Sequence, residues 1–241
     1  MPRVVVRGVP GWVDRERLLG PGDWSGDEAE LSREHAADVA ARLRGIELAG
    51  QPLLVDVQPK LKRNLVRAAR SEDARRRRDT TPGFTRPGAQ LDPQGKISLT
   101  PEVLALRLGE RAKGRTVFDA MCGCGGNAIG FARAGCQVVA ADIDGARLEM
   151  ARHNAKLYGV ADRIRFKHGD SRELEVTSDL LFLDPPWEQM TLLADFAAQS
   201  TWIKAPPGCP VPAGFVAEAW FGEAPGDYRR VKFLLFRSDD A

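Results

Sequence analysis

The sequence predicts an α/β fold: a Rossmann-like, doubly wound sheet that ends in an antiparallel strand, preceded by a small α/β extension. Three observations predict it. Residues 116–132 run from a strand through a glycine-rich turn into a helix, three carboxylates recur at βαβ spacing, and the chain closes with two strands at 214–221 and 231–236. We expect the extension in residues 1–80 and the main domain in residues 81–241.

The first strand of the main domain ends on Asp119 and leads into a glycine-rich loop, after which a helical pattern begins. Gly123 and Gly125 lack a Cβ, so the backbone can turn sharply and lie close to a ligand. The same glycine spacing fits the dinucleotide fingerprint of NAD-binding proteins. A carboxylate at the strand end would repel a pyrophosphate but would suit an ammonium group. Asp119 therefore favours S-adenosylmethionine over NAD.

Two further strands end near carboxylates. Asp142 follows Asp119 by 23 positions, and Asp170 follows Asp142 by 28. Each spacing fits one helix-and-strand step, and residues 146–158 have the pattern of an amphipathic crossover helix. We expect the three carboxylates on one edge of the sheet, with Asp142 binding the ribose hydroxyls and Asp170 the adenine amino group.

A fourth strand, residues 179–183, ends on the motif Asp184-Pro185-Pro186-Trp187. Only 14 positions separate Asp170 from Asp184, so we expect one helical turn or none between them. The prolines fix φ and leave their carbonyls free to accept hydrogen bonds. The exocyclic amine of a nucleobase is a poor nucleophile because its lone pair is delocalised into the ring. If Asp184 and a proline carbonyl accepted its protons while Trp187 stacked on the base, the lone pair would face the methyl group. These four residues are the candidate catalytic residues.

The segment from about Phe84 to Pro186 resembles the trimethylguanosine synthase family, the RNA cap guanine-N2 methyltransferases. The matching stretches are Phe84-Thr85-Arg86, Gln90-Leu91-Asp92-Pro93-Gln94-Gly95, Ser98-Leu99-Thr100-Pro101-Glu102, residues 119–127, Asp142-Ile143-Asp144, residues 151–159 and the Pro-Pro-Trp run.

This resemblance implies the class I fold of S-adenosylmethionine-dependent methyltransferases, with a seven-stranded sheet, S-adenosylmethionine as methyl donor and the N2 amine of guanine in RNA as acceptor. It also implies that the Thr-Pro-Glu segment forms a lip over the methionine end of the cofactor. The candidate cofactor-binding residues are Thr100, Asp119, Gly123, Gly125, Asn127, Asp142 and Asp170. The candidate substrate-binding residues are Phe84, Arg86, Asn154 and Trp187.

The chain departs from the family pattern at three places. Asp184 stands where the family usually has Ser, as in many adenine-N6 and cytosine-N4 methyltransferases, and Lys96 stands where an aromatic residue is usual. Residues 205–210 leave almost no room for a helix between the fifth and sixth strands. An adenine-N6 or cytosine-N4 methyltransferase is therefore an alternative, and a non-catalytic RNA-binding protein with the same fold is another.

The N-terminal region predicts a strand at residues 4–6, a helix at residues 28–43 and a strand at residues 53–57, followed by a basic segment. Residues 60–79 hold nine Lys or Arg against three acids, a net charge of +6 in a chain of +2. Such concentrated charge is typical of binding to a phosphate backbone, so we expect the segment from Lys60 to Arg78 to bind RNA. A solvated helix with a charged linker is the alternative.

Composition excludes several other classes. No apolar run approaches the roughly 18 residues of a membrane span, so we expect a cytoplasmic protein, or a nuclear one if Arg75 to Arg78 serve as a localisation signal. Four cysteines form neither a disulfide framework nor a common zinc pattern, so we expect no metal. None of the three histidines lies in an arrangement typical of a nucleophile. The oligomeric state does not follow from the sequence.

Overall fold

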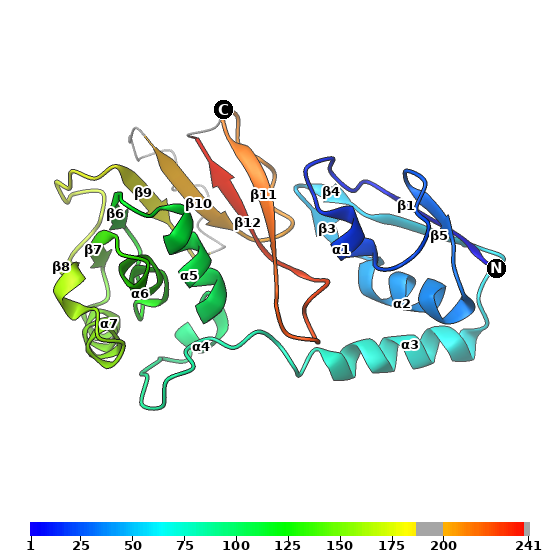
Figure 1. The fold of residues 1–241 in the computed structure, drawn as a ribbon, viewed down its shortest axis with the longest axis horizontal. Helices are drawn as coiled ribbons and strands as arrows, with labels where there is room; N and C mark the ends of the chain where they lie inside the picture. Colours follow the sequence, from blue (N-terminus) through cyan, green and yellow to red (C-terminus); the bar gives the residue numbers. More distant parts are fainter. Residues whose placement is uncertain (187–199, 239–241) are drawn as a thin grey trace. The chain divides into compact units, whose positions relative to one another are not determined.

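The computed structural model describes residues 1–186 and 200–238 of the 241-residue chain. These residues fall into two compact units, shown in Figure 1. The first contains residues 1–81, 206–213 and 217–234. The second contains residues 82–205, 214–216 and the C-terminal residues from 235. Among the described residues, the candidate catalytic and cofactor-binding ones all fall in the second unit.

A seven-stranded sheet has the order β11-β12-β10-β9-β6-β7-β8. Its strands are β6 (Thr116–Asp119), β7 (Gln137–Asp142), β8 (Ile164–His168), β9 (Leu180–Leu183), β10 (Thr201–Ala205), β11 (Val216–Phe221) and β12 (Val231–Arg237). Strands β6 to β10 are parallel, and the last strand of the chain is antiparallel to them. This is the class I methyltransferase order, so the predicted fold class is confirmed. An NAD-binding domain would continue with parallel units.

The register of the sheet brings the predicted strand ends to one edge. Asp119 pairs with Ala140 on β7 and with Phe182 on β9, two residues before Asp184. The four residues of β9 and the five of β10 are all buried, and burial explains the continuous apolar run of β9, Leu180–Leu183. The carboxyl ends of these parallel strands therefore carry the acidic residues that the sequence placed there.

Three helices, α5 (Glu102–Arg111), α6 (Gly126–Arg133) and α7 (Gly145–Leu157), lie side by side against the sheet (Figure 1). Glycine permits the closest approach, between α5 and α6: a Cβ on Gly130 would lie 2.3 Å from the carbonyl oxygen of Ala105. The side chain of Asp144 caps α7 by accepting from the backbone N–H of Ala146 at 2.9 Å. The crossover helix expected at residues 146–158 is thus confirmed. A short helix, α4 (Gly95–Ser98), precedes α5.

Two connections are as short as the sequence predicts. Residues 169–179 form turns without a helix between β8 and β9, and residues 206–215 likewise contain no helix between β10 and β11. A short 3₁₀ helix, η1 (Ala161–Arg163), precedes β8. None of the described helices is both long and apolar enough to cross a bilayer.

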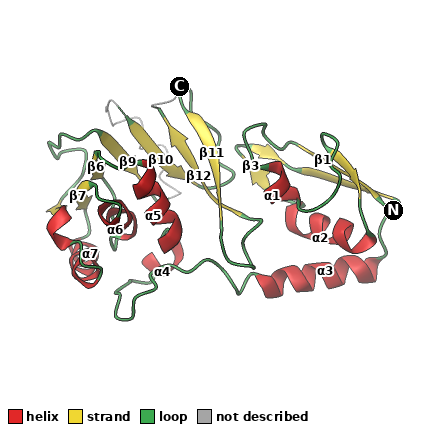
Figure 2. Ribbon diagram, viewed as in Figure 1, coloured by secondary structure: helices red, strands yellow, loops and turns green. Residues whose placement is uncertain are grey.

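The N-terminal residues form a second, antiparallel sheet of order β2-β1-β5, shown by secondary structure in Figure 2. Its strands are β1 (Arg3–Arg7), β2 (Glu28–Glu30) and β5 (Leu54–Gln58), and a hairpin of β3 (Glu47–Leu48) and β4 (Gln51–Pro52) lies between α2 and β5 in the chain. The helices of this region are α1 (Arg15–Leu19), α2 (Arg33–Leu43) and α3 (Arg63–Arg76).

The predicted helix at residues 28–43 is wrong at its start. Residues 28–30 form β2, which pairs with β1, and α2 begins at Arg33. The side chain of Ser32 accepts from the backbone N–H of His35 at 3.2 Å and so fixes the helix start. The alternation of Glu28-Ala29-Glu30, with Ala29 alone buried, is a strand signal that the longer helical pattern concealed.

Candidate active site

Asp119, at the end of β6, is completely buried. Neither carboxylate oxygen accepts a hydrogen bond of normal geometry from the described residues. Burial raises the pKa of this carboxyl well above its usual range, and the negative charges of Asp184 and Asp142 raise the pKa further. The nearby backbone N–H groups of Ala128 and Met121 lower the pKa, but by less than burial and the two charges raise it. Buried polar groups are nearly always hydrogen-bonded, so this carboxylate suits a ligand that brings donors and positive charge.

The loop after β6 has the backbone conformation that its glycines suggest. Gly123 and Gly125 have φ values of +51° and +91°, in the region that favours glycine. A Cβ on Gly123 would have nothing within 4 Å, whereas one on Gly125 would lie 3.0 Å from the Cβ of Ala151. The backbone N–H of Gly123 donates to Oδ2 of Asp142 at 2.7 Å. Asp142 thus holds the loop, and the space beside Gly123 is open.

Two more buried side chains of the second unit have unsatisfied polar atoms. Oγ1 of Thr100 and Oδ1 of Asn127 are buried and accept from no described residue. The amide nitrogen of Asn127 donates to Oδ2 of Asp184 at 2.9 Å, which fixes the orientation of this amide. Together with Asp119, three of the predicted cofactor-binding residues carry polar atoms that no described residue satisfies.

Asp184 is held by a residue that the sequence analysis did not select. The ammonium nitrogen of Lys204, on β10, lies 2.8 Å from Oδ2 of Asp184 and also donates to the carbonyl oxygen of Ser98 at 3.2 Å. Lys204 is only 4% exposed. A lysine within the otherwise apolar run Trp202-Ile203-Lys204-Ala205 is the sequence signal that could have identified it, because buried charges are rare unless they are paired.

Asp170 follows β8 and already has a cationic partner. Its carboxylate accepts from the guanidinium group of Arg172 through both oxygens, at 3.0 and 2.5 Å for the closest contacts. These hydrogen bonds hold the pKa of Asp170 at about 2. The predicted contact of Asp170 with adenine stays a prediction.

Asn154 is completely buried on α7, and its side-chain amide is hydrogen-bonded to the backbone of two other segments. Its Oδ1 accepts from the N–H of Gln90 at 2.7 Å, and its nitrogen donates to the carbonyl oxygens of Gln90 and Cys124 at 2.8 and 3.0 Å. Arg147 pairs with Asp92 at 2.8 Å. These contacts fasten the segment around residues 90–95 to α7 and to the glycine-rich loop after β6. Direct binding of the substrate by Asn154 stays a prediction.

Phe84 and Arg86 surround Tyr158, just after α7. The ring of Phe84 lies 5.4 Å from that of Tyr158, and the guanidinium carbon of Arg86 lies 4.9 Å from the same ring. The hydroxyl of Tyr158 accepts from the backbone N–H groups of Thr85 and Arg86 and donates to Glu102 at 2.6 Å. These contacts fix the position of residues 84–86, the strip of chain that precedes Thr100. The substrate-binding role of Phe84 and Arg86 stays a prediction.

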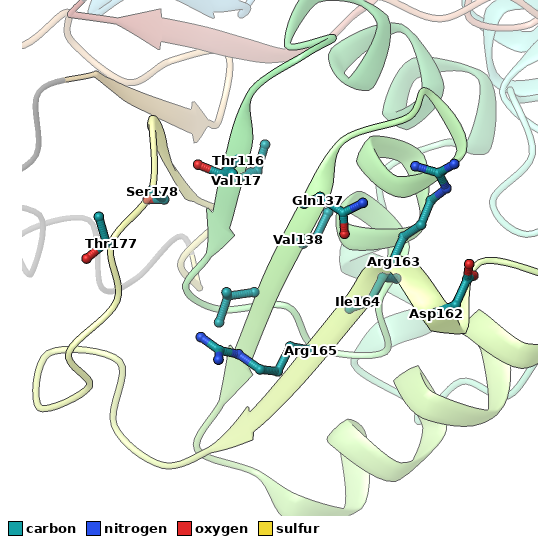
Figure 3. A pocket seen from close by; sticks show the side chains of 11 residues that line it. Thr116, Val117, Gln137, Val138, Asp162, Arg163, Ile164, Arg165, Thr177 and Ser178 are labelled. Atoms are coloured by element: carbon teal, nitrogen blue, oxygen red, sulfur yellow. The ribbon is translucent and has the colours of Figure 1, made fainter.

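The motif after β9 is described in part. Pro185 is buried and Pro186 is exposed, while Trp187 lies outside the described residues. A separate pocket of about 270 Å³ lies at the amino ends of β6, β7 and β8, where Thr116, Gln137 and Ile164 contribute to its lining (Figure 3). Because these strands are parallel, it lies at the opposite end from Asp119 and Asp142. The described residues contain no group of three potential metal ligands.

Comparison with known proteins shows which family resembles this chain. Residues 114–192 match the RNA cap guanine-N2 methyltransferase family. The trimethylguanosine synthase of Schizosaccharomyces pombe is 36% identical over 112 residues, 42% of this chain and 46% of the relative. That of Saccharomyces cerevisiae is 33% identical over 38% of this chain and 33% of the relative. A tRNA (guanine(10)-N2)-dimethyltransferase of Methanothermobacter thermautotrophicus is 36% identical over 31% of this chain and 22% of the relative.

The resemblance that the motifs predict is thereby confirmed, and the chain spans less than half the length of these curated relatives. Among solved structures, an RNA methyltransferase of Salinibacter ruber in complex with S-adenosyl-L-homocysteine is similar with a TM-score of 0.41 and 24% identity, over 57% of this chain and 90% of that one. A putative RNA methyltransferase of Pyrococcus horikoshii has a TM-score of 0.45 and 16% identity, over 69% of this chain and 96% of that one. The strand order, not these overall likenesses, carries the fold assignment.

Proposed function

We propose that this protein is an S-adenosylmethionine-dependent methyltransferase that acts on the N2 amine of guanine in RNA. The observation that carries the proposal is the buried Asp119, whose oxygens have no partner among the described residues and which lies within electrostatic range of Asp184. The match of residues 114–192 to the guanine-N2 methyltransferase family supports the same conclusion. The cytoplasmic or nuclear location expected from the sequence stays part of this proposal.

The unsatisfied atoms fit the proposed cofactor. Its methionine end carries an ammonium group, which would supply donors and positive charge to Asp119. The space beside Gly123 allows a ligand to lie against the loop. One oxygen of Asp142 accepts from the backbone N–H of Gly123 and the other from the backbone N–H of Asp144. Each carboxylate oxygen has a further lone pair, which could accept from a ribose hydroxyl. When bound, S-adenosylmethionine supplies an electrophilic methyl group.

The residues of the chain would then act by orientation. Oδ1 of Asp184 has no donor among the described residues, so it can accept a proton from the exocyclic amine of the base. The carbonyl of Pro185 or Pro186 would accept the other proton, and Trp187 would stack on the ring. Proximity and alignment supply the rate acceleration, without a covalent intermediate on the protein.

Two alternatives make different predictions. An adenine-N6 or cytosine-N4 methyltransferase is favoured by Asp184, whereas the three relatives above are all named for trimethylguanosine synthesis or guanine-N2 methylation. A non-catalytic RNA-binding protein would bind the cofactor or RNA without transfer. Total RNA is incubated with the protein and isotopically labelled S-adenosylmethionine, and the nucleosides are then analysed by mass spectrometry. Label on guanine, on adenine or cytosine, or on no base distinguishes the guanine-N2 enzyme, the alternative enzyme and the non-catalytic protein.

A matched pair of variants tests the site itself. Trp187→Ala should abolish transfer and leave the affinity for S-adenosylmethionine nearly intact, because the indole is assigned to the base. Asp119→Ala should remove cofactor binding. An unchanged rate in Trp187→Ala would contradict the assignment of the motif to the base.

We also propose that helix α3 binds the RNA backbone. Arg75, Arg76 and Arg77 pair with acidic residues of the same unit. The other six basic residues of this segment are exposed and have no acidic partner among the described residues: Lys60, Lys62, Arg63, Arg67, Arg70 and Arg78.

The arrangement of these charges follows from the helix. Arg63, Arg67 and Arg70 have the spacing i, i+4, i+7 and share one face, while α2 packs against α3. A solvated helix with no partner would also carry exposed arginines, but three unpaired ones on a single face suit the evenly spaced charges of a phosphate backbone.

A further inference from the structure

The buried Lys204 lies in the candidate active site, but the proposed function gives it no role. Its ammonium group donates to Oδ2 of Asp184 and to the carbonyl oxygen of Ser98, and Asn127 donates to the same Oδ2. Two donors therefore meet on one oxygen of Asp184, while Oδ1 receives none from the described residues.

We propose that Lys204 is a positioning residue of the methyl-transfer site, which holds Asp184 so that its Oδ1 is left to accept a proton of the acceptor amine. This inference rests on the proposed function. In the transfer, the amine nitrogen forms a bond to the methyl carbon, and the bond between that carbon and sulfur breaks with its electron pair going to sulfur. One amine proton passes to Oδ1 of Asp184 and from there to water.

The charges around Asp184 explain why a lysine is needed. Asp119 on β6 lies within electrostatic range of both Asp184 and Asp142, and burial together with the charges of Asp119 and Asp142 raises the pKa of the Cys122 thiol. Lys204 is the cation that the described residues place in direct contact with Asp184. Without it, no described residue would bring a positive charge into contact with the carboxylate of Asp184, and its largely buried place beside other acids would disfavour the ionised form.

A protonated Asp184 could no longer accept from the amine. An opposite charge in contact with a carboxylate favours its ionised form, so removal of the lysine should favour the protonated form. Lys204 therefore acts through Asp184 and needs no contact with the substrate.

The decisive experiment compares the pH dependence of kcat/KM for the full chain and for Lys204→Met, with guanosine-containing RNA as substrate. The acidic limb of the profile should move to higher pH in the variant. Lys204→Arg should restore most of the wild-type profile. Because the double variant Asp184→Asn with Lys204→Met removes both charges, its activity should fall no further than that of Asp184→Asn alone.

A matched control is available on β12. Lys232 pairs with the buried Asp227 at 3.1 Å, within the other compact unit. Lys232→Met should lower the thermal midpoint without moving the acidic limb. If Lys204→Met does not fold, Lys204→Gln, which keeps a hydrogen-bond donor but no charge, should show the same displacement.

A second readout does not depend on activity. In protein labelled with ¹³C at the aspartate carboxyl groups, the signal that disappears in Asp184→Asn reports the ionisation of Asp184. It should titrate at higher pH in Lys204→Met than in the wild type. Equal titration, or an unmoved pH profile in a folded variant, overturns the role of Lys204. If the wild type methylates no guanine in RNA, the proposed function fails instead, and the titration still decides whether Lys204 controls Asp184.

Discussion

The hydroxyl of Tyr158 donates to a carboxylate oxygen of Glu102 at 2.6 Å, and the same oxygen accepts from the backbone N–H and the hydroxyl of Thr85, each at 2.7 Å. The other oxygen of Glu102 pairs with Arg133 at 2.6 Å. Burial alone would raise the pKa of Glu102, but these hydrogen bonds hold it at about 2. Glu102 thus ties α5, α6, the end of α7 and the strip at residues 84–86 together.

Glu102→Gln should therefore destabilise the fold in a pH-dependent way. A carboxyl whose pKa is lower in the folded state stabilises the protein above its unfolded pKa of 4.5, and this contribution is lost as the pH falls towards 2. The shift corresponds to roughly 3 kcal/mol at neutral pH, and exposure to solvent reduces it. Urea unfolding at pH 7, 4 and 3 should show the difference between wild type and variant shrinking as the pH falls.

Glu149→Gln is the control, because Glu149 is 76% exposed at its side chain and pairs with Arg152 at 3.2 Å. It should change the free energy of unfolding by less than about 1 kcal/mol. A difference between wild type and Glu102→Gln that stays constant from pH 7 to pH 3 would contradict the role of the ionised carboxylate.

The parts of the site that lie at strand ends could be predicted from the sequence. Asp119, Asp142 and Asp184 each end or follow an apolar run, and a parallel sheet brings such ends to one edge whatever the packing of its helices. The apolar runs in the sequence and the topology of the sheet therefore predict the same positions for these carboxylates. The helix start at Arg33 was missed because strand pairing of residues 28–30 with β1 overrode the local pattern.

Cofactor binding should depend on pH through Asp119. Its raised pKa means that the free protein holds a proton on this carboxyl over a range in which an ordinary one is ionised. A cationic ligand binds the ionised form, so the proton must leave and affinity should rise with pH, by up to about tenfold per unit. Isothermal titration calorimetry below pH 7, where the ligand's own amino group stays protonated, should detect the released proton in buffers of different ionisation enthalpy.

Asp119→Asn provides the comparison, because it removes the titrating group while keeping the shape. It should bind S-adenosylmethionine weakly and with no pH dependence between pH 5 and 7. If the wild type released no proton on binding, Asp119 would not be the group that meets the ammonium.

Gly123→Ala should weaken cofactor binding beyond its effect on stability. Gly123 has a positive φ, so alanine there costs about 1 kcal/mol, and the new methyl group enters the open space beside the loop. Gly135 also has a positive φ with open space around it, but it lies after α6 and outside the loop. Gly135→Ala should therefore lose similar stability and keep its affinity, as thermal unfolding and calorimetry can measure. Equal loss of affinity in both variants would contradict the proposal that the cofactor lies against this loop.

The contacts that could not be predicted join residues far apart in the chain. Lys204 and Asp184 meet because β10 lies beside β9, and Asn154 meets Gln90 across 64 positions. A sequence pattern identifies Asn154 as polar on a helix, but its complete burial depends on how residues 88–98 lie against α7. The pairing of Arg76 with Asp38 was equally hidden, because Asp38 belongs to another helix, α2.

The salt dependence of RNA binding should identify the face of α3 that carries it. Replacing Arg63, Arg67 and Arg70 with glutamine should lower RNA affinity for all sequences alike. On a single strand, the slope of log K against log salt should fall by about 0.7 for each phosphate that the variant no longer neutralises. Arg7, Arg33 and Arg44 are exposed, unpaired among the described residues and dispersed over the same unit, so their replacement removes the same charge without removing a continuous face. Fluorescence anisotropy with a labelled single-stranded RNA at 50 to 300 mM salt measures both slopes. If the two triple variants lose affinity equally, net charge and not helix α3 attracts the RNA.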